Sequence, residues 1–301
     1  MLRTVILTLA LSSLILAKTG EEYFKEKKFE KAIEESNKIL KLNPKDFRAL
    51  RVRAKSYRAL GDYKNSNLDY LKLLQMDSDK EQGVSFLVER GAYLKSVGDT
   101  SFVDLYKKGL EIDGGNIDIL NQLSTYYLSK KDYSRSLKYL DREYEENSSL
   151  KVMAKIAKCN FMLKNYDRSA ESYTIILDNS KKSADLFYNR GLSYFYGKHN
   201  SYAYNDFLEA INIDPNYVKA YNSLAKIDLL EKRFDDSIKH YSKSIDIDPN
   251  NFDTYYKRSK AYLYKKQLKK AASDLKRYLK LGGKSIKNPK KIQDLIDQLN
   301  A

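Results

Sequence analysis

The sequence has few of the residues that interrupt helices or build covalent and metal sites. Its 301 residues include 4 prolines, 12 glycines, 1 cysteine, 2 histidines and no tryptophan. Scarce proline and glycine favour a helical chain, because both residues interrupt helices. The lone Cys159 excludes an intramolecular disulfide and a multi-cysteine zinc site, and we expect it to lie inside a helix pair. His199 and His240 belong to no recognisable catalytic or metal-binding motif, so neither a catalytic centre nor a cofactor is predicted.

Positive charge is in excess, with 55 lysines and arginines against 40 aspartates and glutamates, a formal net charge of +15. Such an excess is typical of proteins that bind nucleic acid or other anions. Most of the lysines are nevertheless interspersed with acids, as in the segment EEYFKEKKFEKAIEE. That pattern favours solvated helix faces. The charge therefore biases the choice of partner without identifying it.

Residues 1–17 form a separate segment, with a basic start at Arg3 and an uncharged apolar run from Val5 to Ala17. A helix over this run rises about 20 Å, which is short of the ~30 Å hydrocarbon core of a membrane. A short apolar run behind a basic start predicts a secretory signal peptide. We therefore expect export to the periplasm or cell envelope. The alternative is a retained anchor in the inner membrane formed by residues 5–17.

An internal repeat organises the rest of the chain. Residues 184–217 and 218–251 align without a gap, and Ile213-Asp214-Pro215-Asn216 recurs as Ile247-Asp248-Pro249-Asn250. Each unit holds two amphipathic helical patterns joined by a short polar turn, an organisation typical of helix–turn–helix repeats with a period of about 34 residues. The same register predicts repeats at about residues 18–46, 47–80, 81–116, 117–149, 150–183, 184–217, 218–251 and 252–284. Residues 285–301 are predicted to contain a capping helix that begins at Pro289.

Small and large side chains alternate where the two helices of a repeat should cross. In residues 184–217 the first helix supplies Gly191, and the second supplies Ala203 and then Phe207. Only small side chains allow helix axes to approach within about 8–10 Å, and a large partner fills the remaining space. Equivalent residues recur along the chain, which predicts a stack of closely crossed helix pairs.

These residues resemble the tetratricopeptide-repeat family over residues 18–284. The family pattern is met most fully by Phe187, Gly191, Tyr194, Ala203, Phe207 and Pro215. The resemblance implies an all-α, right-handed superhelical solenoid of about eight repeats, of a bacterial exported type. It also implies a non-catalytic interaction scaffold or adaptor, which binds a peptide or helix of a partner protein in its concave groove. A monomer is expected, with weak self-association left open.

Two sets of residues fall on the first-helix positions that line such a groove. The basic set is Arg48, Arg51, Lys55 and Arg58, and the aromatic and polar set is Tyr188, Phe195, Asn222 and Tyr256. Cations at these spacings share one helical face and repel one another, which favours an acidic ligand. A solvated basic face and, for the tyrosines, packing against the next repeat remain alternatives. Reversing Arg51 and Lys55 to glutamate is expected to abolish partner capture without much change in melting temperature.

The alternatives to a peptide-binding scaffold differ in the partner or in the function. Chaperone-binding members of the family carry a five-residue carboxylate clamp, of which this chain has only Asn189 and Lys219, so no chaperone partner is implied. A basic anion- or nucleic-acid-binding protein and an accessory subunit of an envelope enzyme complex are the alternative functions. Nucleic acid is not the expected partner, and membrane contact is expected only through the N-terminal segment if it is uncleaved.

Overall fold

The computed structural model describes residues 18–74, 76, 80–282 and 288–300, so the expected signal peptide or anchor lies outside the described residues. Every regular element in these residues is an α-helix. The helices are α2 (Gly20–Lys25), α3 (Phe29–Leu42), α4 (Phe47–Ala59), α5 (Tyr63–Leu74), α6 (Lys80–Ser96), α7 (Phe102–Ile112), α8 (Ile117–Ser129), α9 (Tyr133–Asn147), α10 (Leu150–Met162), α11 (Tyr166–Asn179), α12 (Ala184–Tyr196), α13 (Asn200–Ile213), α14 (Val218–Leu230), α15 (Phe234–Ile247), α16 (Phe252–Tyr264), α17 (Leu268–Gly282) and α18 (Pro289–Asn300). None of these described helices is long and apolar enough to cross a membrane.

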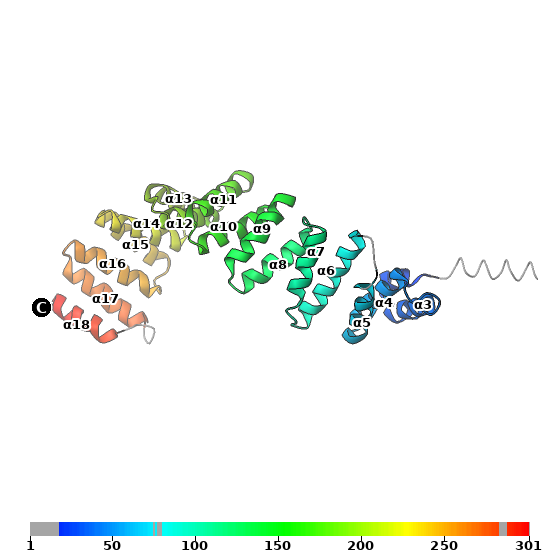
Figure 1. Ribbon diagram of the computed structural model, residues 1–301. Coiled ribbons are helices and arrows are strands. Elements are labelled where there is room, and N and C mark those ends of the chain that lie inside the picture. The colour runs from blue at the N-terminus through cyan, green and yellow to red at the C-terminus, as the bar shows by residue number, and fades with distance from the viewer. Residues whose placement is uncertain (1–17, 75, 77–79, 283–287, 301) are drawn as a thin grey trace, which may run out of the picture. The chain divides into compact units, whose positions relative to one another are not determined.

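The chain divides into two compact units, one ending at Tyr126 and the other beginning at Tyr127, within α8. Inside each unit, helices that follow one another in sequence pack against one another, for example α4 on α5 in unit 1 and α12 on α13 in unit 2 (Figure 1). Turns of a few residues between amphipathic helices favour antiparallel neighbours. The described helices follow one another in packed pairs and α18 packs on α17, which confirms the predicted all-α solenoid with a capping helix.

The crossing of α12 and α13 shows why small residues recur in the repeat. A Cβ atom added to Gly191 would lie 2.7 Å from Cε1 of Phe207, closer than real Cβ contacts come. Ala203 and Phe207 are fully buried on the facing helix. The same arrangement recurs in unit 1, where Ala54 and Tyr70 are fully buried. Close axes therefore depend on the size of a few side chains, as the sequence pattern predicts.

Buried ion pairs that no local sequence pattern predicts join the two helices of three repeats. The pairs are Arg53–Asp69, Arg190–Asp206 and Arg258–Asp274, each with the same spacing in the chain and each with two guanidinium–carboxylate hydrogen bonds. Each arginine also donates to a side chain on the second helix of the preceding repeat: Asn37, Thr174 and Ser242. One guanidinium thus connects three helices, because it presents several donors in a fixed geometry.

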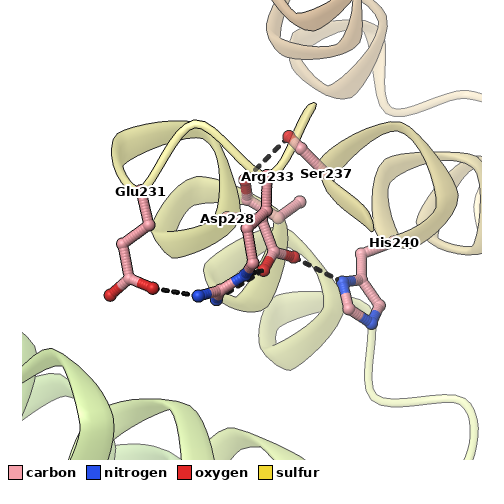
Figure 2. Close-up of polar contacts among 6 residues, drawn as sticks. Asp228, Glu231, Arg233, Ser237 and His240 are labelled. Atoms are coloured by element: carbon pink, nitrogen blue, oxygen red, sulfur yellow. Dashed lines mark hydrogen bonds and ion pairs between the residues drawn. The ribbon is translucent and has the colours of Figure 1, made fainter. Parts of the chain in front are cut away.

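The repeat of α14 and α15 uses a different polar network (Figure 2). Leu224 stands where the other three repeats have the arginine, and the buried carboxylate is Asp228. It lies between Arg233, at 2.7 Å, and Nδ1 of His240, also at 2.7 Å. Ser237 donates to the carbonyl of Ala225 beside them. The carboxylate is fully enclosed by partners, as a buried charge requires.

The turn inside each repeat ends with one residue in the left-handed region. These residues are Lys27, Gly61, Gly98, Lys131, Lys164, Lys198, Lys232 and Lys266, with φ between 55° and 79°. The next residue donates its N–H to the carbonyl five positions earlier, for example Asn165 to Asn160. This hydrogen bond is the usual end of a helix whose terminating residue is glycine. Lysine nevertheless occupies the position in most of these turns.

The final helix, α18, covers the end of the stack as the sequence predicts. Ile296 is fully buried against Ala272 and Leu275 of α17, and the neighbouring apolar residues of α18 pack on the same cluster. An end that is covered in this way keeps the last repeat from exposing its apolar face.

Candidate functional site

The predicted basic set lies on α4 in unit 1. Arg48, Arg51 and Lys55 line one side of a cavity of about 640 Å³, together with Phe24, Phe47 and other residues of α2 and α4. The cavity also contains Glu21 and Lys25, so its charge is mixed. Arg58 lies apart from this cavity, beside the hydroxyl of Tyr70. The pKa of Tyr70 is raised, mainly by burial and then by Glu89, and Arg58 opposes this shift. The structure thus brings three of the four predicted cations together.

A carboxylate of the next repeat reduces the charge of this set. Glu89, on α6, lies 3.2 Å from Nη2 of Arg51 and 2.7 Å from Nζ of Lys55. Arg51 also donates to Ser85, the residue at the equivalent position of the next repeat. Two of the four cations therefore have an internal partner. Neither of the two sequence-based interpretations, a solvated basic face or a site for an external acidic ligand, included such a partner. The repeat period could have revealed it, since one repeat beyond Arg51 falls on Ser85, one helical turn before Glu89.

The aromatic and polar set lies in unit 2, where three of its four members share one cavity. This cavity, which we call the groove pocket, has a volume of about 270 Å³. It is lined by Tyr188, Leu192, Phe195, Tyr196, Lys219, Asn222, Ser223, Lys226 and Lys257, which come from α12, α14 and α16. Tyr256, the fourth predicted member, lies elsewhere, with its ring centroid 5.0 Å from that of Tyr278 and its side chain against the cluster that α18 covers.

Three lysines make the groove pocket positive. Nζ of Lys226 lies 4.5 Å from the ring centroid of Phe195, and burial, with a smaller effect of Lys257, lowers the Lys226 pKa. Among the described residues, no carboxylate pairs with Lys219, Lys226 or Lys257. Asn222 belongs to the predicted set, whereas Lys219 and Lys226, at equivalent groove positions of the same helix, do not. Their charge, beside aromatic rings, is the signal that would have found the pocket.

The aromatic floor and the polar groups of the groove pocket are held in place by neighbouring side chains. The Tyr188 ring centroid lies 5.6 Å from that of Phe207 and 5.3 Å from that of Tyr217, and burial raises the Tyr188 pKa. Asn222 accepts a hydrogen bond from Thr254 at 3.3 Å. Because its carbonyl oxygen is engaged, the Asn222 amide presents its NH₂ group as a donor. The pocket therefore offers cations, an amide donor and an apolar surface together.

The residues with catalytic potential are engaged elsewhere in the fold. Cys159 is fully buried, and burial raises the pKa of its thiol, which disfavours the reactive thiolate. His199 lies 3.1 Å from Asp167 at a turn, and His240 belongs to the network of Asp228. No group of three or more histidines, cysteines or acids among the described residues is arranged to hold a metal ion.

Two stretches of the chain match models of repeat families. Residues 15–46 match the family described as "Tetratricopeptide repeat", and residues 227–267 match the one described as "TPR repeat". The Hsp70-Hsp90 organizing protein of Triticum aestivum is 23% identical over 235 residues, which cover 74% of this chain and 39% of that protein. The chain therefore spans about two fifths of the length of that relative.

Solved structures show the same architecture. The structure described as "Structure of Naa15/Naa10 bound to HypK-THB" superposes with a TM-score of 0.69 at 13% identity, over 86% of this chain and 41% of that one. The crystal structure of YrrB, described as a TPR protein with an unusual peptide-binding site, gives a TM-score of 0.50 at 16% identity, over 65% of this chain and 97% of YrrB. Identities this low establish the fold alone. Together with the matched segments, they show that this chain carries tetratricopeptide repeats and has the fold of a tetratricopeptide solenoid.

Proposed function

We propose that the chain is a non-catalytic interaction scaffold that docks an extended, acidic segment of a partner protein in the groove pocket. The observation that carries this proposal is the set of three lysines, none of them paired with a described carboxylate, around an aromatic floor. YrrB is described as having a peptide-binding site, and the name of the Triticum aestivum relative refers to organising other proteins. Both descriptions support a role in protein–protein interaction.

The chemistry of the pocket favours a carboxylate next to an apolar side chain. Lys226 is partly desolvated over Phe195, so a carboxylate at its ammonium group would form a charge-assisted hydrogen bond in a weakly solvated place. The Asn222 amide can donate to a peptide carbonyl, and Leu192 and Phe195 offer apolar contact. Extended peptides are recognised in this way, by polar contacts to the main chain and pockets for side chains.

A binding assay with peptides of defined charge tests the proposal. Lys226→Ala is expected to weaken the binding of acidic peptides that contain aromatic residues by about fivefold to tenfold, since one charge-assisted hydrogen bond is lost. Fluorescence anisotropy with acidic, neutral and basic versions of one peptide measures the effect. The control is Lys239→Ala, an exposed lysine on α15 outside the pocket. Equal affinity for the three peptides, or equal losses in the two variants, would contradict docking in the pocket.

A scaffold without catalysis is supported by where the reactive side chains lie. Cys159, His240 and Asp228 are engaged inside the helix stack, where they stabilise the repeat instead of facing a cavity. The description of YrrB, which refers to a peptide-binding site, agrees with a role in interaction.

We further propose export to the periplasm or cell envelope, on the basis of residues 1–17. A short apolar run behind Arg3 supports a signal peptide, and a retained segment 5–17 would instead anchor the chain in the inner membrane. The intact mass of the native protein in soluble and membrane fractions is the test. A soluble species that lacks Met1 to Ala17 is expected. A full-length species in the membrane fraction would favour the anchor, and a full-length soluble species would exclude both.

A further inference from the structure

Lysine occupies strained turn positions throughout unit 2. Lys164, Lys198, Lys232 and Lys266 have φ of 64°, 68°, 61° and 55°, each in the turn of a successive repeat. A side chain in the left-handed region clashes with its own backbone, and glycine avoids the clash. Unit 1 has Gly61 and Gly98 as well as Lys27 at this turn position, and Lys131 occupies it in the first turn of unit 2. Local backbone geometry therefore does not explain lysine here, and strained residues that recur at one place indicate a function.

The four lysines also lack internal partners. All four are exposed, and none has a side-chain hydrogen bond or ion pair with another described residue. Three nearby acids of the same turns have other partners, Asp167 with His199, Glu231 with Arg233 and Asp235 with Lys265. None of the four lysines therefore forms an ion pair with these acids.

Large apolar side chains are exposed beside each lysine. Two positions before each one, at the last position of the first helix, stand Met162, Tyr196, Leu230 and Tyr264. Leu230 is 59% exposed, and Tyr264 is 65% exposed although its ring stacks on Phe234. Because successive antiparallel helices pack in order from α10 to α17, these turns recur along one edge of the unit. We call these four lysines and four apolar residues the turn edge.

We propose that the turn edge binds an anionic lipid surface. Lysine ammonium groups bind acidic headgroups, and exposed leucine, methionine and tyrosine side chains enter the apolar layer just beneath them. Duplex nucleic acid accepts apolar side chains only as wedges between unstacked base steps, and single strands need stacking surfaces in a groove. An acidic protein surface would satisfy the lysines but not the apolar side chains. The inference does not depend on the groove pocket, since none of the four lysines lines that pocket and Tyr196 is the one residue of the turn edge that does.

The test compares variants of the full chain in sedimentation with vesicles. The first variant combines Lys164→Gly, Lys198→Gly, Lys232→Gly and Lys266→Gly. One lysine near an anionic surface increases partitioning about fivefold, so we expect a loss of about tenfold or more from vesicles of equal parts phosphatidylserine and phosphatidylcholine. The melting temperature should not fall, because glycine relieves the strained φ. Every variant keeps residues 1–17, so differences between variants report on the turn edge.

A matched control removes the same charge elsewhere in unit 2. Lys239→Gln, Lys243→Gln, Lys276→Gln and Lys280→Gln change four exposed lysines of α15 and α17 and should cost much less binding. A second variant, Leu230→Ser with Tyr264→Ser, should weaken vesicle binding but leave binding to polyglutamate unchanged. Equal losses in the two lysine variants would overturn the proposal. So would a Leu230→Ser, Tyr264→Ser variant that binds vesicles like the parent, because an acidic polymer would then explain the lysines.

Discussion

Replacing Asp206 with alanine should lower the free energy of unfolding of unit 2 by about 3 to 5 kcal/mol. Asp206 accepts hydrogen bonds from Nε and Nη2 of Arg190 at 2.9 and 2.7 Å, and the two side chains are only 6% and 19% exposed. Burial raises the Asp206 pKa, against the opposing effect of Arg190. Without the carboxylate, a guanidinium would remain buried with Thr174 as its remaining hydrogen-bond partner. Urea unfolding followed by circular dichroism measures the loss.

A double replacement separates the cost of an unpaired charge from the value of the pair. Arg190→Met together with Asp206→Leu should unfold within about 1 kcal/mol of the parent, because an apolar pair of similar volume needs no charge compensation. The exposed Asp246→Ala is the surface control, and its effect should be within about 0.5 kcal/mol. If Asp206→Ala behaves like Asp246→Ala, the buried pair does not hold the repeat together.

Reversing Arg51 and Lys55 to glutamate should destabilise unit 1 by about 2 kcal/mol, since Glu89 would lose both cations and face two new carboxylates. Glu89 has a side chain only 15% exposed, so solvent replaces those partners poorly. This expectation differs from the one based on sequence, in which the same change leaves the melting temperature nearly unaltered. The melting temperature and the urea midpoint both report the outcome.

Two further variants distinguish stability from binding in this region. Adding Glu89→Arg to the double reversal should restore most of the stability, because the charges are exchanged in place. Arg48→Glu alone should leave stability unchanged, since Arg48 is exposed and has no ion pair with another described residue. Any change in partner capture by Arg48→Glu then reports on binding alone. A failure of Glu89→Arg to rescue the double reversal would mean that Glu89 is not the partner that matters.

The helix pairs could be predicted because repeats make local sequence informative. Each repeat must bury the same face against its neighbours, so the same sizes recur from one repeat to the next, as Gly191 and Phe207 illustrate. The turns and the start of α18 follow from the same period and from Pro289. The polar contents of the stack were less predictable. In the sequence, Arg190 and Asp206 look like ordinary surface charges. No local pattern indicates that these two residues, which lie on different helices, meet in the interior.

The predicted aromatic and polar set is brought together in part, for a related reason. Positions within a helix indicate which residues share one face, and Tyr188, Phe195 and Asn222 line one cavity. The positions did not show that Tyr256 packs against Tyr278, because that contact depends on how α16 packs on α17 and on the cluster that α18 covers. Nor did they show that Lys219, Lys226 and Lys257 surround the same cavity from two repeats.

The sequence by itself determined the repeat length, the helical class and the places where helices must approach closely, because these follow from side-chain size and periodicity within one unit. Only the tertiary structure decided which charges are satisfied. Arg51 and Lys55 have Glu89 as a partner, whereas the groove lysines and the turn lysines have no described carboxylate. The physical reason is that electrostatic interactions depend on distances of a few ångströms between residues of different repeats, and those distances are set by helix packing.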